Sequence, residues 1–250
     1  MDKVILEAKN IIVFFENAIA VNDISIEITE GEIVGLFGPN SSGKSTILNV
    51  ISGLILYKKK KEDRKGGERI TIKGNVFLNG NDITWLWPYN RARLGITISR
   101  ERRPVFLESS VEENLKIAGY MLKKKEFLNR IEMIYSIFPH LRLIRNRKAG
   151  LLSGGEQQML SISMALIPNP KIILLDEPLF GLSPALYNEL ITAMSRIKAY
   201  GTGILIAEQF AMPILPLINR GYVIENGSLV FQGTQKDLTA NDNIYSAYLV

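Results

Sequence analysis

Cysteine is absent from the 250-residue sequence, and histidine occurs once, as His140. Without cysteine the chain holds no disulfide, thiolate zinc site or iron–sulfur cluster of its own, which fits a reducing compartment. A single histidine leaves little for an imidazole metal site, and the polar neighbourhood of His140 predicts a surface position. No run of eighteen apolar residues occurs either, so we expect a soluble chain without a membrane-spanning helix.

The positive charge of the sequence is concentrated in one segment. Thirty Lys and Arg outnumber 25 Asp and Glu, a net charge of +5 that would suit nucleic acid or an anionic membrane. Residues 58–69 alone hold seven basic and three acidic residues, or +4, which leaves about +1 elsewhere. We therefore expect no nucleic-acid partner. The lysine run at 58–65 is predicted to be a solvated loop, either a disordered surface insertion or a contact with anionic lipid head groups.

Hydrophobic patterning predicts an α/β fold, and 46% hydrophobic residues suffice for its core. Strands are expected at residues 4–14, 20–28, 33–37, 70–78, 172–175 and 204–207, and helices at 45–52, 111–120, 126–138, from about 154, and 184–200. Because alternating strands and helices build a parallel sheet covered by helices, the last hundred residues predict such a sheet.

A phosphate-binding loop is predicted at residues 38–45, which read GPNSSGKS between an apolar strand and a helix. Gly38 and Gly43 let the backbone curl so that its N–H groups point at phosphate oxygens, and the following helix adds its positive end. Lys44 is expected to reach the β- and γ-phosphates, and the Ser45 hydroxyl to ligate Mg²⁺. The expected nucleotide-binding residues are Gly38, Pro39, Asn40, Ser41, Ser42, Gly43, Lys44, Ser45 and Thr46.

An acidic pair ends a second apolar strand, in the sequence IILLDEP at residues 172–178. The carboxyl end of a parallel strand is where such sheets place their chemistry. We expect Asp176 to hold Mg²⁺, directly or through water, and Glu177 to orient and deprotonate the attacking water. The pair therefore predicts hydrolysis of the nucleotide.

A second phosphate-binding helix terminus is predicted in LLSGGEQQ at residues 151–158. Ser153 can cap the helix, and Gly154 and Gly155 let a polyphosphate approach its positive end, next to Glu156. If the first loop already holds the triphosphate, the second terminus has a ligand only when another protomer presents its nucleotide. The alternative is an ordinary helix capped by serine.

The three motifs, in this order and spacing, resemble the ATP-binding subunits of ATP-binding cassette transporters over nearly the whole chain. The resemblance implies a P-loop NTPase core with a mixed sheet, an antiparallel β subdomain and an inserted helical subdomain near 105–165, within a single domain at 1–250. It implies an ATPase that uses ATP and Mg²⁺, pairs with a second ATPase subunit around two ATP molecules, and drives transmembrane permease subunits from the cytoplasmic face of the cell membrane. The family's adenine-stacking aromatic corresponds to Phe15, although the adjacent Phe14 and a core role for either stay open.

Two departures from the general family pattern narrow the resemblance. The usual glutamine between the lobes corresponds to Glu101, expected at the metal with Ser45 and Asp176, and the usual switch histidine to Gln209. Further shared segments are DIT at 82–84, RARLGI at 91–96, VEENL at 111–115, GEQQML at 155–160, GYVIENG at 221–227 and AYL at 247–249. Together these features resemble the ATPase subunits of branched-chain amino acid importers, whose two ATPases are commonly different chains.

Other departures predict changes in turnover. Gln209 can donate an amide hydrogen bond to a γ-phosphate but cannot become charged, so turnover should depend less on pH near neutrality than with histidine. Met164 stands where the family has an arginine, which should weaken support for the signature helix. Ser183 replaces an aspartate, which should weaken communication across the dimer. Trp85 and Trp87 fit either the core or a groove that receives a membrane subunit's helix.

Two rival functions use some or all of the same motifs. A non-transport cassette ATPase in a cytosolic assembly shares all three motifs, but its ribosomal and DNA-repair types carry a tandem copy or a coiled-coil insert, which this chain lacks. A P-loop kinase or GTPase does not require LSGGEQ, and the guanine signature N-K-x-D is absent. We therefore favour the transport ATPase.

Overall fold

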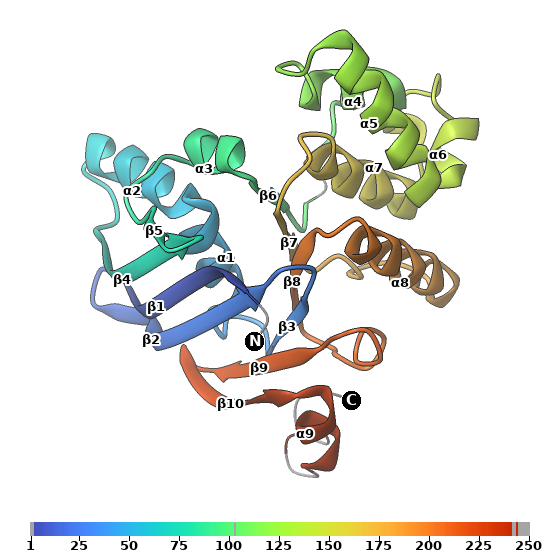
Figure 1. Cartoon of the computed structure of the whole chain (residues 1–250). Coiled ribbons are helices and arrows are strands. Elements are labelled where there is room, and N and C mark those ends of the chain that lie inside the picture. The colour runs from blue at the N-terminus through green and yellow to red at the C-terminus, as the bar shows by residue number, and fades with distance from the viewer. Residues whose placement is uncertain (1–2, 103, 242–243, 245–250) are drawn as a thin grey trace.

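Two β-sheets and a group of helices make up the computed structural model, which describes residues 3–102, 104–241 and 244 (Figure 1). The predicted AYL segment at 247–249 lies outside these residues. In chain order the elements are β1 (Val4–Phe15), β2 (Ala18–Thr29), β3 (Ile33–Phe37), α1 (Lys44–Ser52), α2 (Leu54–Lys65), β4 (Ile70–Leu78), β5 (Asn81–Asp82), α3 (Pro88–Leu94), β6 (Ile96–Ser99), α4 (Val111–Ala118), α5 (Lys124–Ile137), α6 (Pro139–Leu143), the 3₁₀ turn η1 (Ala149–Leu151), α7 (Gly154–Leu166), β7 (Ile172–Asp176), α8 (Pro184–Ala199), β8 (Gly203–Glu208), β9 (Arg220–Glu225), β10 (Ser228–Thr234) and α9 (Gln235–Ala240).

The central sheet is mixed, as the resemblance implied. Its strand order is β10-β9-β3-β8-β7-β6, and all neighbours are parallel except β9 and β10. Every residue of β3, β7 and β8 is buried, which explains why these strands read as continuous apolar runs. Because the three strands are parallel neighbours, their carboxyl ends meet at one edge, where the phosphate loop and the acidic pair follow.

An antiparallel sheet of order β2-β1-β4-β5 packs beside the central sheet. Alternating residues of β1 and β2, including Leu6 and Ile26, are fully buried. They share one hydrophobic cluster with Leu48 of α1 and Leu36 of β3. This cluster fixes α1, and with it the end of the phosphate loop, between the two sheets.

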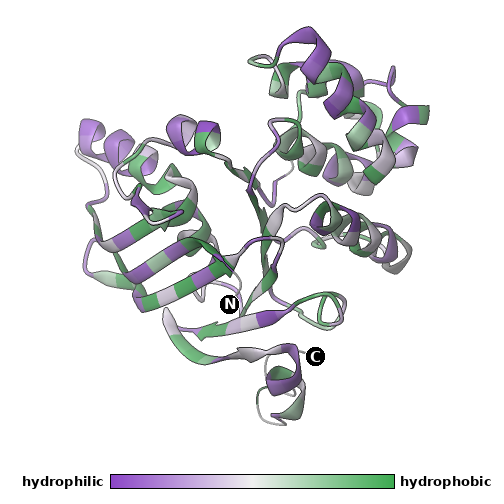
Figure 2. Ribbon diagram, in the orientation of Figure 1, coloured by the Kyte–Doolittle hydropathy of each residue, from purple (hydrophilic) through white to green (hydrophobic). Residues whose placement is uncertain are grey.

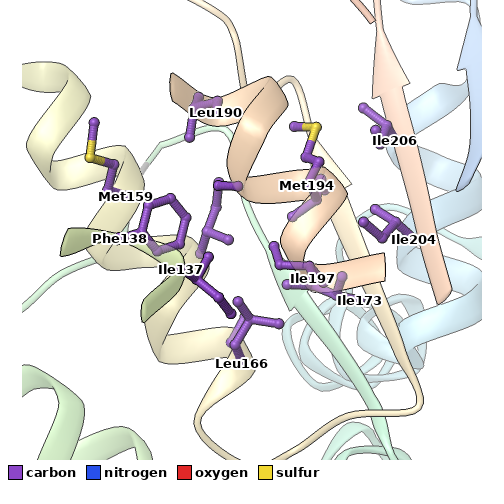
Figure 3. Packing of buried hydrophobic residues seen from close by; sticks show 14 of the residues in the cluster. Ile137, Phe138, Met159, Leu166, Ile173, Leu190, Met194, Ile197, Ile204 and Ile206 are labelled. Carbon is purple, nitrogen blue, oxygen red and sulfur yellow. The ribbon is translucent and has the colours of Figure 1, made fainter. Parts of the chain in front are cut away.

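The helices α4 to α7 form a separate lobe (Figure 1). A second hydrophobic cluster joins this lobe to α8 and the central sheet, and Figure 3 shows Met194 of α8 lying between Phe138 and Ile204 of β8. Ser110 and Ser153 cap α4 and α7, each in a reciprocal pair with the glutamate three residues on. Among the described residues, every helix is too short or too polar to span a lipid bilayer.

The predicted loop at 58–65 is wrong, because this segment lies within helix α2. Lys, Glu and Arg are favourable helix formers, and no glycine or proline interrupts residues 54–65. Ile55 and Leu56 are buried and anchor the helix, while Arg64 and Lys65 complement the negative end of its dipole. The charged composition that suggested a loop therefore belongs to a helix held at its first turn.

Candidate functional site

The phosphate loop connects β3 to α1 and requires glycine at two positions. A Cβ atom on Gly38 would lie 2.0 Å from the carbonyl oxygen of Ile224, and one on Gly43 would lie 2.6 Å from that of Ala20. Gly43 also has a φ of 106°, in the left-handed region that favours glycine. The loop therefore packs directly against neighbouring backbone, and a side chain at either glycine would collide with it.

Lys44 begins α1 and curls back over the loop. Its Nζ atom donates hydrogen bonds to the carbonyl oxygens of Gly38, at 2.8 Å, and Pro39, at 3.0 Å, and lies 3.7 Å from Oε1 of Glu177. Burial lowers the pKa of Lys44, and the Glu177 charge opposes that shift. The ammonium group thus lies between the phosphate loop and the acidic pair.

The acidic pair lies where β7 ends, as predicted. Ser45 donates a 2.9 Å hydrogen bond from Oγ to Oδ1 of Asp176, which joins two of the three predicted metal ligands directly. Burial raises the pKa of both Asp176 and Glu177, and the negative charge of Glu101 raises both further. The structure therefore brings Ser45, Asp176, Glu177 and Glu101 into one electrostatic neighbourhood.

These residues fit a magnesium–nucleotide complex. Mg²⁺ prefers oxygen ligands and usually takes one or two from the protein, with the rest from water and phosphate. The Ser45 hydroxyl and Asp176 carboxylate match that need, and no larger His, Cys, Asp or Glu cluster occurs among the residues the structure describes. Within the loop, the buried Ser42 hydroxyl has no hydrogen-bond partner in the described structure, an unsatisfied group that a phosphate oxygen would suit.

Phe15 ends β1 next to the phosphate loop. Its half-buried side chain lines a hollow together with Thr46 and Asn49 of α1, and Phe14 is not among the residues that line it. The Nζ atom of Lys58 lies 4.0 Å from the centroid of the Phe15 ring. Of the two adjacent aromatics, Phe15 is thus the one that borders the loop helix.

Gln209 follows β8, the strand between β3 and β7. The register pairs Asp176 with Ala207, and Phe37, which precedes the phosphate loop, with Glu208. Gln209 therefore emerges between the loop and the acidic pair, and its side chain is half-buried.

Glu208 is a buried carboxylate at this edge that the sequence analysis missed. Its Oε1 accepts a 2.8 Å hydrogen bond from the backbone N–H of Leu179, just after the acidic pair. Burial raises the pKa of Glu208 to about 8, despite hydrogen bonds from Leu179 and the backbone of Gln209. The available signal was a carboxylate ending an otherwise apolar strand, GILIAE.

The helix terminus that the sequence predicts to bind a second phosphate opens α7. Ser153 Oγ accepts from the N–H of Glu156 at 3.3 Å, and Glu156 Oε2 accepts from the N–H of Ser153 at 2.6 Å. Glu156 Oε1 also lies 2.8 Å from Nε2 of His140, so the histidine is joined to this terminus. The side chain of His140 is 43% exposed, which agrees with the predicted surface position. Gly154 is half-buried and Gly155 is buried. Figure 1 places α7 in the helical lobe, apart from the loop between β3 and α1.

A groove of about 400 Å³ lies between the helical lobe and the rest of the chain. Leu54 of α2 and Tyr89 of α3 line one side, and Ala118 of α4 and Met164 of α7 line the other. Neither tryptophan lines it. Trp87 packs on the hydrophobic cluster of the sheets, and Trp85 is 64% exposed.

Sequence comparison identifies known relatives of the chain. The family described as ABC transporter matches residues 21–180. The high-affinity branched-chain amino acid transport ATP-binding protein BraG of Pseudomonas aeruginosa is 34% identical, with 92% of this chain and 93% of BraG covered. The probable branched-chain amino acid transport ATP-binding protein LivF of Archaeoglobus fulgidus is 36% identical over 88% of both. The lipopolysaccharide export system ATP-binding protein LptB of Escherichia coli is 30% identical over 98% of this chain and 96% of its own.

Solved structures agree with the fold. The ADP conformation of MJ1267, an ATP-binding cassette of an ABC transporter, matches with a TM-score of 0.79 at 29% identity over 97% of each chain. A nucleotide-free cassette matches with a TM-score of 0.80 at 28% identity, over 96% of this chain and 97% of that one. With the phosphate loop, acidic pair and capped α7 terminus all present, the chain is an ATPase and belongs to the family of ABC transporter ATP-binding proteins.

Proposed function

We propose that the chain is the ATP-hydrolysing subunit of a membrane importer for branched-chain amino acids or a related small solute. The observation that carries the proposal is the edge of the central sheet, where Lys44, Ser45, Asp176 and Glu177 meet. The names of BraG and LivF support an amino-acid solute, whereas LptB is a relative with a different one.

Each residue at this edge has a distinct role in the proposed hydrolysis. Lys44 and the loop N–H groups bind the β- and γ-phosphates, and Ser45, Asp176 and Glu101 hold Mg²⁺, which neutralises phosphate charge when bound. Glu177 orients the attacking water and accepts its proton, for which a raised pKa is favourable. Gln209 donates an amide hydrogen bond to the γ-phosphate, and Phe15 stacks on the adenine.

A second ATPase subunit completes the site in this proposal. Ser153, Gly154, Gly155 and Glu156 lie in the lobe away from the phosphate loop, so we infer that they meet the nucleotide of a partner, either a second copy or a different chain. Two ATP molecules then lie between two subunits. Closure on ATP and reopening after hydrolysis supply motion to the membrane partner.

The groove between the lobes is the proposed seat of a transmembrane permease subunit. Its lining joins the part of the chain that holds the phosphate loop to the helical lobe that carries Ser153, so a helix seated there would couple to both. The chain then acts as a single unit on the cytoplasmic face of the membrane, with the helical subdomain near 105–165 inserted in its core. Met164 gives the groove a flexible apolar wall.

The test is to purify the tagged chain from its own membranes and identify the proteins that accompany it. A multi-span permease, together with ATP-dependent uptake of an amino acid in vesicles, is the expected result. Ribosomes or another soluble assembly would contradict the proposal and support the non-transport ATPase. A permease that carries another solute would correct only the substrate.

A further inference from the structure

Both sides of the groove continue into surfaces that combine lysine or arginine with exposed aromatic or large apolar side chains. Leu54, which lines the groove, begins α2, and Ala118, which lines the opposite side, ends α4. The α2 rim comprises Tyr57, Lys60, Lys61, Arg64 and Lys65, with the neighbouring Trp85 and Tyr89. The other surface, called the α4 rim because it follows the end of α4, comprises Tyr120, Met121 and Lys123 before α5, and Lys124 and Lys125 in the first turn of α5.

The α2 rim is one face of a helix. Its five α2 residues recur at spacings of three and four, which places them on the same side, and all five are exposed. The opposite side holds the buried Ile55 and Leu56. Of the acidic residues nearby, Asp63 lies 3.5 Å from Lys59 and Glu68 lies 3.4 Å from Lys58, whereas Glu62 is half-buried and is not one of the residues of this face. The outward face of α2 is thus basic and carries no acidic residue.

The α4 rim contradicts ordinary helix electrostatics. Lys123, Lys124 and Lys125 stand at the start of α5, where the helix dipole is positive and no side chain caps the end. Each misplaced charge of this kind typically disfavours a helix slightly, and Ser110 and Ser153 show that this chain caps other helices well. Glu126 is the acidic residue of this first turn, so the three lysines still leave a net positive charge at the positive end of the helix. A locally unfavourable charge of this kind indicates a role outside the fold.

Large side chains accompany the charges on both rims. Trp85 is 64% exposed, Tyr89 60% and Tyr57 61%, while Tyr120 and Met121 of the α4 rim are 79% and 56% exposed. Tryptophan and tyrosine beside lysine and arginine are typical of the membrane–water interface, where the ring is half-buried and the cation meets phosphate. Figure 2 shows hydrophilic stretches at α2 and at the outer end of the helical lobe, on the same edge of the molecule.

We propose that the two rims bind anionic lipid head groups on either side of the permease. The proposal rests on the proposed function, because a permease in the groove would turn both rims toward the membrane. The net +4 of residues 58–69 provides the charge complementarity, since each basic residue near an anionic surface contributes about fivefold in affinity.

The test is co-sedimentation of the purified chain with phosphatidylcholine vesicles, with and without phosphatidylglycerol, at low and high salt. Two double variants remove charge from the rims: R64Q with K65Q on α2, and K124Q with K125Q on α5. The matched control, K73Q with K236Q, removes two exposed lysines on β4 and on α9, which lies at the other end of the molecule in Figure 1. The wild-type chain should bind only the anionic vesicles, and more weakly at high salt.

Each rim pair should weaken vesicle binding by about 25-fold, and the control pair by much less. Losses equal to that of the control, or equal binding to neutral vesicles, would overturn the proposal. Intact vesicle binding with lost permease co-purification would also overturn it, in favour of a protein-binding face. ATPase activity, measured on the same samples, should not change. A failure of the proposed function would appear separately, as absence of a permease from the membrane purification.

Discussion

At the scale of single residues, the site depends on carboxylates whose burial favours their protonated forms. Glu208 is the extreme case, with a pKa of about 8 against 4.5 for an exposed glutamate. Between these values the folded chain keeps the proton while the unfolded chain has released it. The contribution of Glu208 to the free energy of unfolding is therefore fully present below about pH 4.5 and is lost as the pH rises toward 8.

Replacing Glu208 with glutamine should remove this pH dependence. Glutamine cannot ionise, and its oxygen can still accept the hydrogen bond from the N–H of Leu179. Thermal unfolding followed at about pH 5 and pH 8 should show a smaller fall in melting temperature for Glu208→Gln than for the wild type. The raised pKa of Glu208 corresponds to a free-energy change on the order of a few kcal/mol. The exposed Glu30→Gln is the control. Equal falls for the wild type and both variants would contradict the expected linkage.

Gly43→Ala should distort the phosphate loop and weaken ATP binding without unfolding the chain. The new methyl group would lie 2.6 Å from a backbone oxygen at a φ of 106°, so the loop must shift. Strain of this kind costs about 1–3 kcal/mol, which predicts a loss of ATP affinity of about 5- to 150-fold in a fluorescent-nucleotide titration.

The control for that change is Gly66→Ala. Gly66 is also left-handed, with a φ of 62°, but a Cβ there meets nothing within 4 Å. The Gly66→Ala chain should bind ATP like the wild type. Equal losses in the two variants would mean that strain of the left-handed backbone, rather than collision of the new methyl group with neighbouring backbone, lowers the affinity for ATP.

At the scale of elements, Ser153 both caps α7 and is proposed to meet the nucleotide of a partner subunit, so its replacement tests the two roles together. Ser153→Ala removes the acceptor for the Glu156 N–H and should destabilise α7 by about 1 kcal/mol. Because this terminus lies in the helical lobe, ATP binding by the isolated chain should be unchanged while turnover falls. Steady-state ATPase assays and nucleotide titration check this separation. Ser110→Ala, which removes the matching cap of α4, is the control and should leave turnover nearly intact.

The elements that the sequence predicted are those with strong local signals. The predicted phosphate loop and acidic pair lie at the ends of β3 and β7, as expected, because short apolar runs (IVGLF and IILL) form buried strands, and a glycine or a charged residue marks where each strand ends. The α2 prediction was wrong because composition alone does not separate a charged helix from a loop. Only packing of Ile55 and Leu56 decides between the two. Glu208 was missed for a related reason: a carboxylate that ends an apolar strand, as in GILIAE, is a weak signal, because such a residue can equally lie at the surface.

At the scale of the whole molecule, the phosphate loop and the α7 terminus proposed to bind a second nucleotide lie in different lobes, so the proposed site needs a second subunit. Glu177→Gln should lower hydrolysis by about 10²–10⁴-fold, the usual contribution of a general base, while the neutral side chain leaves ATP binding intact. With ATP and Mg²⁺ the variant should therefore elute as a dimer in gel filtration, and without nucleotide as a monomer.

The double variant Glu177→Gln with Lys44→Ala tests whether bound ATP, rather than contact between protein surfaces, holds that dimer together. Lys44 lies between the loop carbonyls and Glu177, so its removal should prevent tight ATP binding but change no residue of the α7 terminus. If the nucleotide joins the subunits, the double variant stays monomeric with ATP. A dimer that persists would mean that the subunits associate through protein surfaces alone. A wild-type chain that is fully active as a monomer would exclude the shared site, because Ser153 would then have no phosphate to bind.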